Sequence, residues 1–163
     1  MESLQYQGWH FEFDKEATQK YYASHHDKCS CAPCRNFHKN IKEMPLEVKR
    51  FLEEFGIDID NPIEQMSVIA LKEENLVEQE VQYCVKGIAT SNELYEIDIG
   101  SVQIAILNNN ETANHEMEEP CFGLFIFNMF FHWTVDDDIN ECYPEHLSIL
   151  ERLKSYIKRM WNM

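Results

Sequence analysis

Glycine is scarce in this sequence, with five residues in 163. No segment has the glycine pattern of a loop that cradles phosphate groups, and none has the Gly-x-Ser-x-Gly turn of a hydrolase nucleophile. These absences favour a non-enzymatic binding protein over a nucleotide-dependent enzyme or a serine hydrolase.

Basic residues are also few. There are 14 lysines and arginines against 29 aspartates and glutamates, which gives a net charge of −15. Nucleic acids and anionic membranes repel such a surface, so we expect neither of them as a partner. A basic protein partner is compatible with this charge, although solubility alone is the simpler interpretation.

Long apolar runs are missing. The longest apolar stretch, Phe122–Trp133, is interrupted by Asn128 and His132 and is too short to span a bilayer as a helix. The N-terminal Met1–Ser3 lacks the basic start and apolar run of a signal peptide. We therefore expect a cytoplasmic protein whose six cysteines are reduced thiols rather than a disulfide framework.

The segment His25–His38 concentrates the reactive side chains, with three of the six cysteines and three of the seven histidines. Pro33 suits the first position of a helix, because its φ is already helical and it has no N–H to leave unpaired. This predicts a helix that begins at or just after Cys31, with Cys34 in its first turn. The free N–H groups and the dipole of that helix would favour thiolate over thiol.

Three interpretations of this Cys/His cluster are open, and the first is a structural zinc site. The predicted ligands are Cys29, Cys31, Cys34 and His38. His38 is preferred as the fourth ligand because it lies one helical turn after Cys34, and His25 and His26 are the alternatives. The pattern lacks a second C-x-x-C or H-x-x-x-H pair downstream.

The second interpretation is redox chemistry. Cys31-Ala-Pro-Cys34 has the C-x-P-C form of thioredoxin-like sites, in which the first cysteine attacks and the second resolves. The third interpretation is that the cysteines simply pack as small apolar residues. Arg35 and Asn36 could bind an anion at the helix start, but local pairing with the chain's own carboxylates and turns is favoured.

The same segment resembles a known family. The run Cys-x-Cys-x-x-Cys-Arg-Asn-Phe from Cys29, followed by Pro45, a short helix and Phe55-Gly-Ile-Asp, resembles uncharacterised bacterial proteins that share a C-x-C-x-x-C-R-N-aromatic signature. The resemblance covers Cys29–Pro62. It implies a helix that ends in a Gly-Ile-Asp turn and then a β-rich half, with no established activity.

The remaining pattern predicts a single α+β domain over residues 1–163. A strand is expected at Trp9–Phe13, and Asp14–Ser24 is either helical or irregular. A second helix should begin at Pro45 and end at Gly56, with one apolar face made by Val48, Phe51, Leu52 and Phe55.

From Gln65 onward the apolar residues alternate, and no helical crossover interrupts them, which predicts an antiparallel sheet. Gly87 is expected to mark a β-bulge. Tyr95–Leu107 is either a strand pair or one long bent strand, in which a bulge at Gly100 would reset the register. Cys121–Val135 should be a central strand. A final helix from Pro144, with an apolar stripe up to Trp161, should pack on the sheet.

The sequence therefore predicts a small non-enzymatic binding or immunity-like protein with a structural Cys/His cluster, for which zinc is the candidate ion. The alternative is a thiol-dependent redox enzyme that uses Cys31 and Cys34.

Overall fold

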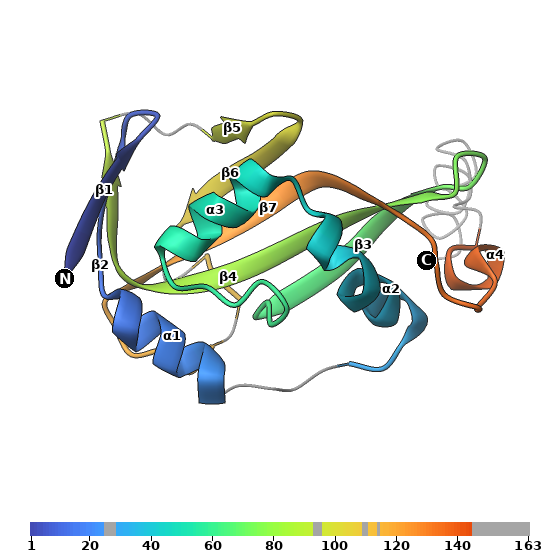
Figure 1. Ribbon diagram of the computed structural model, residues 1–163, viewed down its shortest axis with the longest axis horizontal. Coiled ribbons are helices and arrows are strands. Elements are labelled where there is room, and N and C mark those ends of the chain that lie inside the picture. The colour runs from blue at the N-terminus through green and yellow to red at the C-terminus, as the bar shows by residue number, and fades with distance from the viewer. Residues whose placement is uncertain (25–28, 93–95, 109–110, 114, 145–163) are drawn as a thin grey trace, which may run out of the picture.

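The computed structural model describes residues 1–24, 29–92, 96–108, 111–113 and 115–144 (Figure 1). These residues form a mixed α+β structure dominated by an antiparallel sheet. The strands are β1 (Glu2–Tyr6), β2 (Trp9–Phe13), β3 (Glu64–Leu71), β4 (Leu76–Ser91), β5 (Ile97–Ile99), β6 (Val102–Leu107) and β7 (Cys121–His132). The helices are α1 (Lys15–Ser24), α2 (Ala32–Asn40), α3 (Leu46–Glu54) and α4 (Ile139–Cys142), with a 3-10 turn η1 (Ile41–Glu43).

The sheet has seven strands in the order β1-β2-β4-β7-β6-β5, and β3 pairs with β4 beside this path. Every recorded pair is antiparallel, as the sequence predicts. The predicted central strand is confirmed, since β7 lies between β4 and β6 (Figure 1). No helix of the described residues is both long and apolar enough to cross a membrane.

Neither glycine marks a bulge, and the strand pair is the observed one of the two alternatives for the segment around Gly100. Gly100, with φ of +64°, is in the tight turn that joins β5 to β6, where Ile99 pairs with Val102. That turn makes a hairpin rather than one bent strand. The register between β4 and β7 shifts between Gln79 and Val81 instead, where Asn128 of β7 adopts a φ of +58°.

Gly87 is required for a different reason, which is close approach of two strands. It pairs with Phe13 of β2, and a Cβ at position 87 would lie 2.2 Å from the carbonyl oxygen of Glu12. The residue marks the point where β4 leaves β7 and begins to pair with β2. Only glycine fits there.

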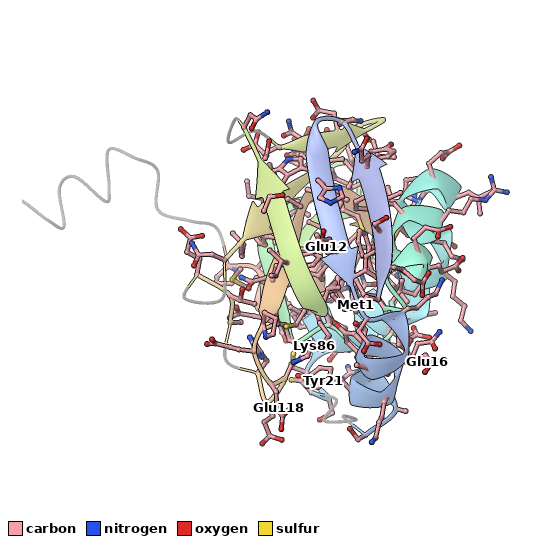
Figure 2. All side chains as sticks on the ribbon, turned by 90° about the vertical axis from the view of Figure 1, so that its left-hand side faces the viewer. Met1, Glu12, Glu16, Tyr21, Lys86 and Glu118 are labelled. Atoms are coloured by element: carbon pink, nitrogen blue, oxygen red, sulfur yellow. The ribbon has the colours of Figure 1, made fainter. Side chains whose placement is uncertain are left out.

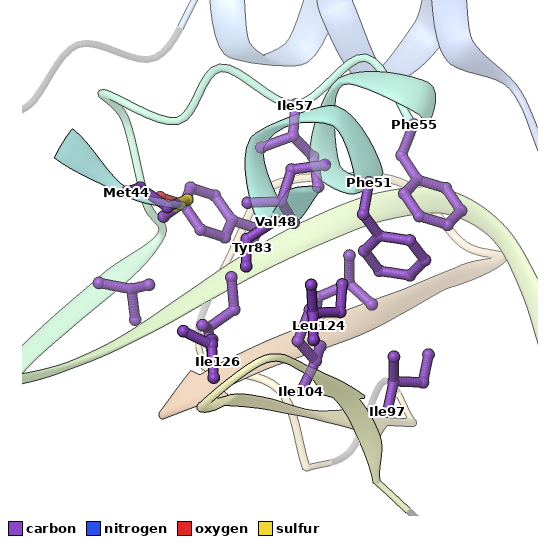
Figure 3. Packing of buried hydrophobic residues seen from close by; sticks show 14 of the residues in the cluster. Met44, Val48, Phe51, Phe55, Ile57, Tyr83, Ile97, Ile104, Leu124 and Ile126 are labelled. Carbon is purple, nitrogen blue, oxygen red and sulfur yellow. The ribbon is translucent and has the colours of Figure 1, made fainter. Parts of the chain in front are cut away.

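The core lies between the helices and one face of the sheet. The predicted apolar face of α3 is confirmed, since Val48, Phe51, Leu52 and Phe55 are all buried. Figure 3 shows this face of α3 directed at Tyr83, Leu124 and Ile104 from the strands. Gly56 ends the helix with φ of +80°, as predicted.

One strand was not predicted, and the helical alternative for Asp14–Ser24 is the one observed. The edge strand β1 was not predicted because Glu2–Tyr6 is too polar to show a buried alternation, and it pairs only with β2. Within Asp14–Ser24, Lys15–Ser24 forms α1. The first turn of α1 is capped by a hydrogen bond from the Ala17 N–H to the Asp14 carboxylate at 2.9 Å. The helix predicted from Pro144 onward lies outside the described residues.

Candidate functional site

The start of α2 places the cysteines as predicted. Cys31 is the residue before the helix, with an extended backbone, and Pro33 lies in the first turn. The carbonyl oxygen of Cys31 accepts the first helical hydrogen bond, from the Arg35 N–H at 2.9 Å. The unpaired N–H groups of this turn therefore point toward the loop that carries Cys29.

The three sulfur atoms of Cys29, Cys31 and Cys34 all lie within 4.8 Å of one another. Cys29 and Cys31 are exposed and Cys34 is half-buried. All six cysteines of the chain are free thiols. We call this set the cysteine triad.

The triad is electrostatically uneven. Hydrogen bonding from the backbone of Cys31, and then from the neighbouring thiols, lowers the pKa of Cys29. Partial burial, followed by bonds with Cys31 and Cys29, raises the pKa of Cys34 to about 12. One exposed thiol is therefore disposed to ionise, while a neighbour holds its proton.

A zinc ion fits this arrangement. Sulfur ligands at bond lengths of about 2.3 Å in a tetrahedron lie about 3.8 Å apart. The sulfur atoms of the triad, which all lie within 4.8 Å of one another, are compatible with this separation. Zinc would deprotonate all three thiols, including Cys34. The structure brings together three of the four predicted ligands.

The fourth predicted ligand is not a member of this group of mutually close atoms. His38 is half-buried, and its ring lies 5.4 Å from that of Phe37. His38 as a ligand stays a prediction, and the alternatives His25 and His26 lie outside the described residues.

A small apolar cluster packs around the start of α2, next to the triad. Trp133, at the end of β7, packs with Ala32 and Val77, and its ring lies 5.7 Å from that of Tyr143. The Trp133 indole N–H donates to the carbonyl oxygen of Asp137 at 2.7 Å. Burial raises the pKa of Tyr143, while a hydrogen bond with the Ser67 side chain lowers it, and the charges of Cys142, Cys31 and Cys34 add smaller upward effects.

Polar side chains tie α2 to the end of β7. Asn36 is fully buried, and its side-chain oxygen accepts a hydrogen bond from the Thr134 N–H at 2.8 Å. Asn40 donates to the Asn36 carbonyl oxygen at 2.8 Å and to the Thr134 hydroxyl at 2.9 Å. Arg35 pairs with the Asp137 carboxylate and with the carbonyl oxygen of Ser30. Arg35 thus pairs with a carboxylate, as predicted, whereas Asn36 holds the end of β7 rather than capping a turn.

Replacing Asn36 by alanine should lower the free energy of unfolding by about 1–3 kcal/mol, because the buried Thr134 N–H would lose its acceptor. Urea denaturation followed by circular dichroism measures this change. The exposed Asn92→Ala is the matched control, and it should cost no more than about 0.5 kcal/mol. Equal effects of the two substitutions would contradict the anchoring role of Asn36.

The acidic run after β7 has a structural role. Asp138 caps α4, since its carboxylate accepts from the Asn140 N–H at 2.8 Å. Asp137 is the partner of Arg35. These contacts agree with the interpretation of the run as turn residues rather than as an acid–base pair.

A second group of possible ligands was missed by the sequence analysis. Cys84, His115 and Cys121 offer ligand atoms that lie within 4.8 Å of one another, whereas the sequence left these cysteines isolated. In the pairing of β4 with β7, Cys84 lies opposite Gly123 and Lys86 opposite Cys121, so the two cysteines are diagonal neighbours on one face. This proximity follows from the register of β4 and β7 and cannot be deduced from the spacing of the cysteines in the sequence.

Comparison with known proteins adds no relative. No protein family, curated protein or solved structure matches this chain. The fold and site define an antiparallel α+β protein with a cysteine triad at a helix N-terminus, and the resemblance through the C-x-C-x-x-C-R-N-aromatic signature stays a prediction.

Proposed function

We propose that this is a non-enzymatic binding protein, of the immunity-protein kind, in which the cysteine triad is a structural zinc staple. The partner that we propose is a basic protein. The observation that carries the binding role is an acidic and apolar surface on the face of the sheet opposite α3.

This surface, the outer patch, is made by side chains of β3, β4 and β7. Met66 and Phe130 are its exposed members, Glu80 and Phe127 are half-buried, and Glu78 is 8% exposed between them. Met66 pairs with Glu80, and Phe130 pairs with Glu78, so the two carboxylates run between apolar neighbours. Phe130 is 42% exposed and Met66 37%. Exposed apolar side chains that lie together are typical of a contact surface for another protein.

The carboxylates give the outer patch its polarity. Partial burial, and then the charge of Glu78, raises the pKa of Glu80. A lysine or arginine from a partner would stabilise the ionised form of Glu80, because an opposite charge close to a carboxylate favours its ionisation. Together with the net charge of −15, this favours a basic partner.

The double substitution Glu78→Gln and Glu80→Gln tests this role. Partners retained from cell extract by the immobilised protein are identified by mass spectrometry, purified and titrated against each form by calorimetry. The patch variant should bind at least about tenfold more weakly, which corresponds to the loss of about 1.4 kcal/mol. The control, Glu73→Gln with Glu74→Gln, removes the same charge from exposed positions in the β3–β4 turn and should bind like the unaltered protein.

The proposal fails if purified partners bind all three forms equally, or if the unaltered protein retains nothing above the bare support. Circular dichroism of each form verifies that the fold is unchanged.

The asymmetry of the triad favours one second candidate, a thiol-dependent redox enzyme. Cys31 is exposed, as an attacking thiol must be, and the pKa of the half-buried Cys34 is raised to about 12, as suits a resolving thiol. In this mechanism the Cys31 thiolate would attack a substrate disulfide, and Cys34 would then displace the second thiol to leave a Cys31–Cys34 disulfide.

Alkylation of the metal-free protein distinguishes the two candidates. Thiolate is the reactive form, and its fraction rises with pH toward the pKa, so Cys29 should be labelled at lower pH than an ordinary thiol and Cys34 last. If Cys31 is labelled quickly well below pH 8, the redox enzyme is supported. If Cys31 reacts slowly up to pH 8, the staple is supported. Peptide mass spectrometry assigns each label.

A further inference from the structure

The second group of ligands lies at the opposite end of β4 from the triad. Cys84 is fully buried, and Met117 and Cys121 are each 8% exposed. The loop before β7 carries His115 and Met117 over the sheet, and the three sulfur-containing residues form a small cluster of their own. No contact of the proposed function uses this cluster.

The distances within the cluster match a metal site. The Cys84 and Met117 sulfur atoms are 3.6 Å apart, and the Cys121 sulfur is 3.8 Å from Nε2 of His115. Ligands at bond lengths of about 2.3 Å in a tetrahedron are separated by about 3.8 Å. Two edges of such a tetrahedron are therefore already formed.

We propose that Cys84, His115, Met117 and Cys121 form a buried binding site for copper(I). The donors are two thiolates, a thioether and an imidazole. Zinc sites draw their ligands from cysteine, histidine and carboxylates, whereas a thioether selects a softer ion such as copper(I). Binding of Cu⁺ releases the two thiol protons to solvent and changes no oxidation state.

The charge around the site comes from the two thiolates and from Lys86. Two thiolates and Cu⁺ leave one negative charge, and Lys86 lies close enough to supply the balancing positive charge. Lys86 pairs with Cys121, and its ammonium donates to the carbonyl oxygens of Glu118 and Glu119 at 2.8 Å each. Figure 2 shows Lys86 and Glu118 at the same end of the molecule.

Two acidic groups also face the cluster. The Glu119 carboxylate acts against ionisation of Cys121, and it lies in the same loop as the carbonyl groups that hold Lys86. The backbone of Glu116 is hydrogen-bonded to Tyr21, which packs against the cluster. Neither acid is a member of the group of ligand atoms.

An ion can reach the site from the surface. A cavity of about 550 Å³ is lined by Gly87, Glu119, Pro120 and Cys121, among others. Cys121 is thus both a ligand of the buried group and part of the cavity wall. Exchange of copper with a soluble donor does not require the sheet to open.

The test uses the full chain with Cys29, Cys31 and Cys34 replaced by serine, so that the triad cannot bind the probe. Copper(I) is titrated under anaerobic conditions against bathocuproine disulfonate, a coloured copper(I) chelator. We expect one equivalent to be withheld from the chelator. Cys121→Ser should abolish this binding, and Met117→Leu, which preserves the side-chain volume, should weaken it at least about tenfold, since even indirect support of a metal site is worth that much. Met44→Leu, at a buried methionine outside the cluster, is the control and should leave copper binding unchanged.

X-ray absorption of the loaded protein keeps the test decisive if Cys121→Ser fails to fold. Sulfur and nitrogen neighbours of copper support the site, and a shell of oxygen and nitrogen alone overturns it. The proposal is also overturned if the folded protein withholds no copper, if Met117→Leu binds as tightly as its parent, or if Zn²⁺ binds the site and Cu⁺ does not. None of these results bears on the cysteine triad, which is absent from the protein tested.

Discussion

Replacing Phe55 by alanine is expected to lower the free energy of unfolding by about 3–5 kcal/mol. Phe55 is fully buried, and its ring lies 4.8 Å from that of Phe13 and 5.1 Å from that of Phe11, both on β2. The ring of Phe122 on β7 is 5.9 Å away. Truncation would remove contacts to two strands at once and leave a cavity where α3 meets the sheet.

Guanidinium denaturation followed by tryptophan fluorescence measures this loss. Leu46→Ala lies on the same helix, where Leu46 is 53% exposed, and should change stability by no more than about 0.5 kcal/mol. Phe55 is the C-cap of α3, so the difference between the two substitutions reports the packing of its ring rather than the propensity of the helix. A cost for Phe55→Ala as small as that of the control would show that α3 does not pack on the sheet in solution.

Loading the cysteine triad with zinc is the second large effect that we expect. Protein prepared without chelator should carry about one equivalent of zinc at the triad, with sulfur–zinc distances of about 2.3 Å by X-ray absorption. When free zinc is about a thousand times its dissociation constant, binding stabilises the state that holds it by about 4 kcal/mol. The stabilised state is the one in which the Cys29 loop is joined to α2.

Hydrogen exchange locates this effect. Chelation should raise the exchange of the amides in the first turn of α2, because the loop and the helix lose their common ligand. The strands β4 and β7 should keep their protection in the core that Phe37 of α2 shares with α3. Cys34→Ser should exchange like the chelated protein whether or not zinc is added. Cys142→Ser, outside the triad, should keep both the zinc and the protection.

Absence of zinc by elemental analysis, together with exchange that a chelator does not alter, would contradict the staple. His38→Ala then gives a separate result. Loss of zinc in this variant supports His38 as the fourth ligand, and retention of zinc shows that the ligand is another group. The zinc prediction for the triad itself is unaffected by that outcome.

Elements of the fold were predictable where the spacing of apolar residues close in the sequence indicates which positions are buried. The spacing of Val48, Phe51, Leu52 and Phe55 fits one face of a helix, and all four are buried against the sheet. The continuous apolar run of β7 indicated a strand covered on both faces, and it lies in the middle of the sheet. Pro33 and Gly56 marked a helix start and a helix end because their backbone preferences act within a few residues.

The missed features depend on partners that are distant in the chain. β1 pairs only along one edge, so no buried face marks it in the sequence. Gly87 was interpreted as a bulge, but its small size is required by the backbone of Glu12 and Phe13 on another strand. The glycine indicated an unusual backbone position, but the sequence could not show that the backbone of β2 leaves no room for a side chain there.

The two cysteine groups show the same difference between features set by nearby residues and features set by distant partners. Cys29, Cys31 and Cys34 lie within six residues, so a short loop and one helical turn are enough to bring their sulfur atoms together, and the sequence alone determined that triad. Cys84 and Cys121 come together only because β4 and β7 pair in one particular register, and a slip of one residue would place them on opposite faces of the sheet. Register is set by the packing of the whole core, so only the tertiary structure decided the second group.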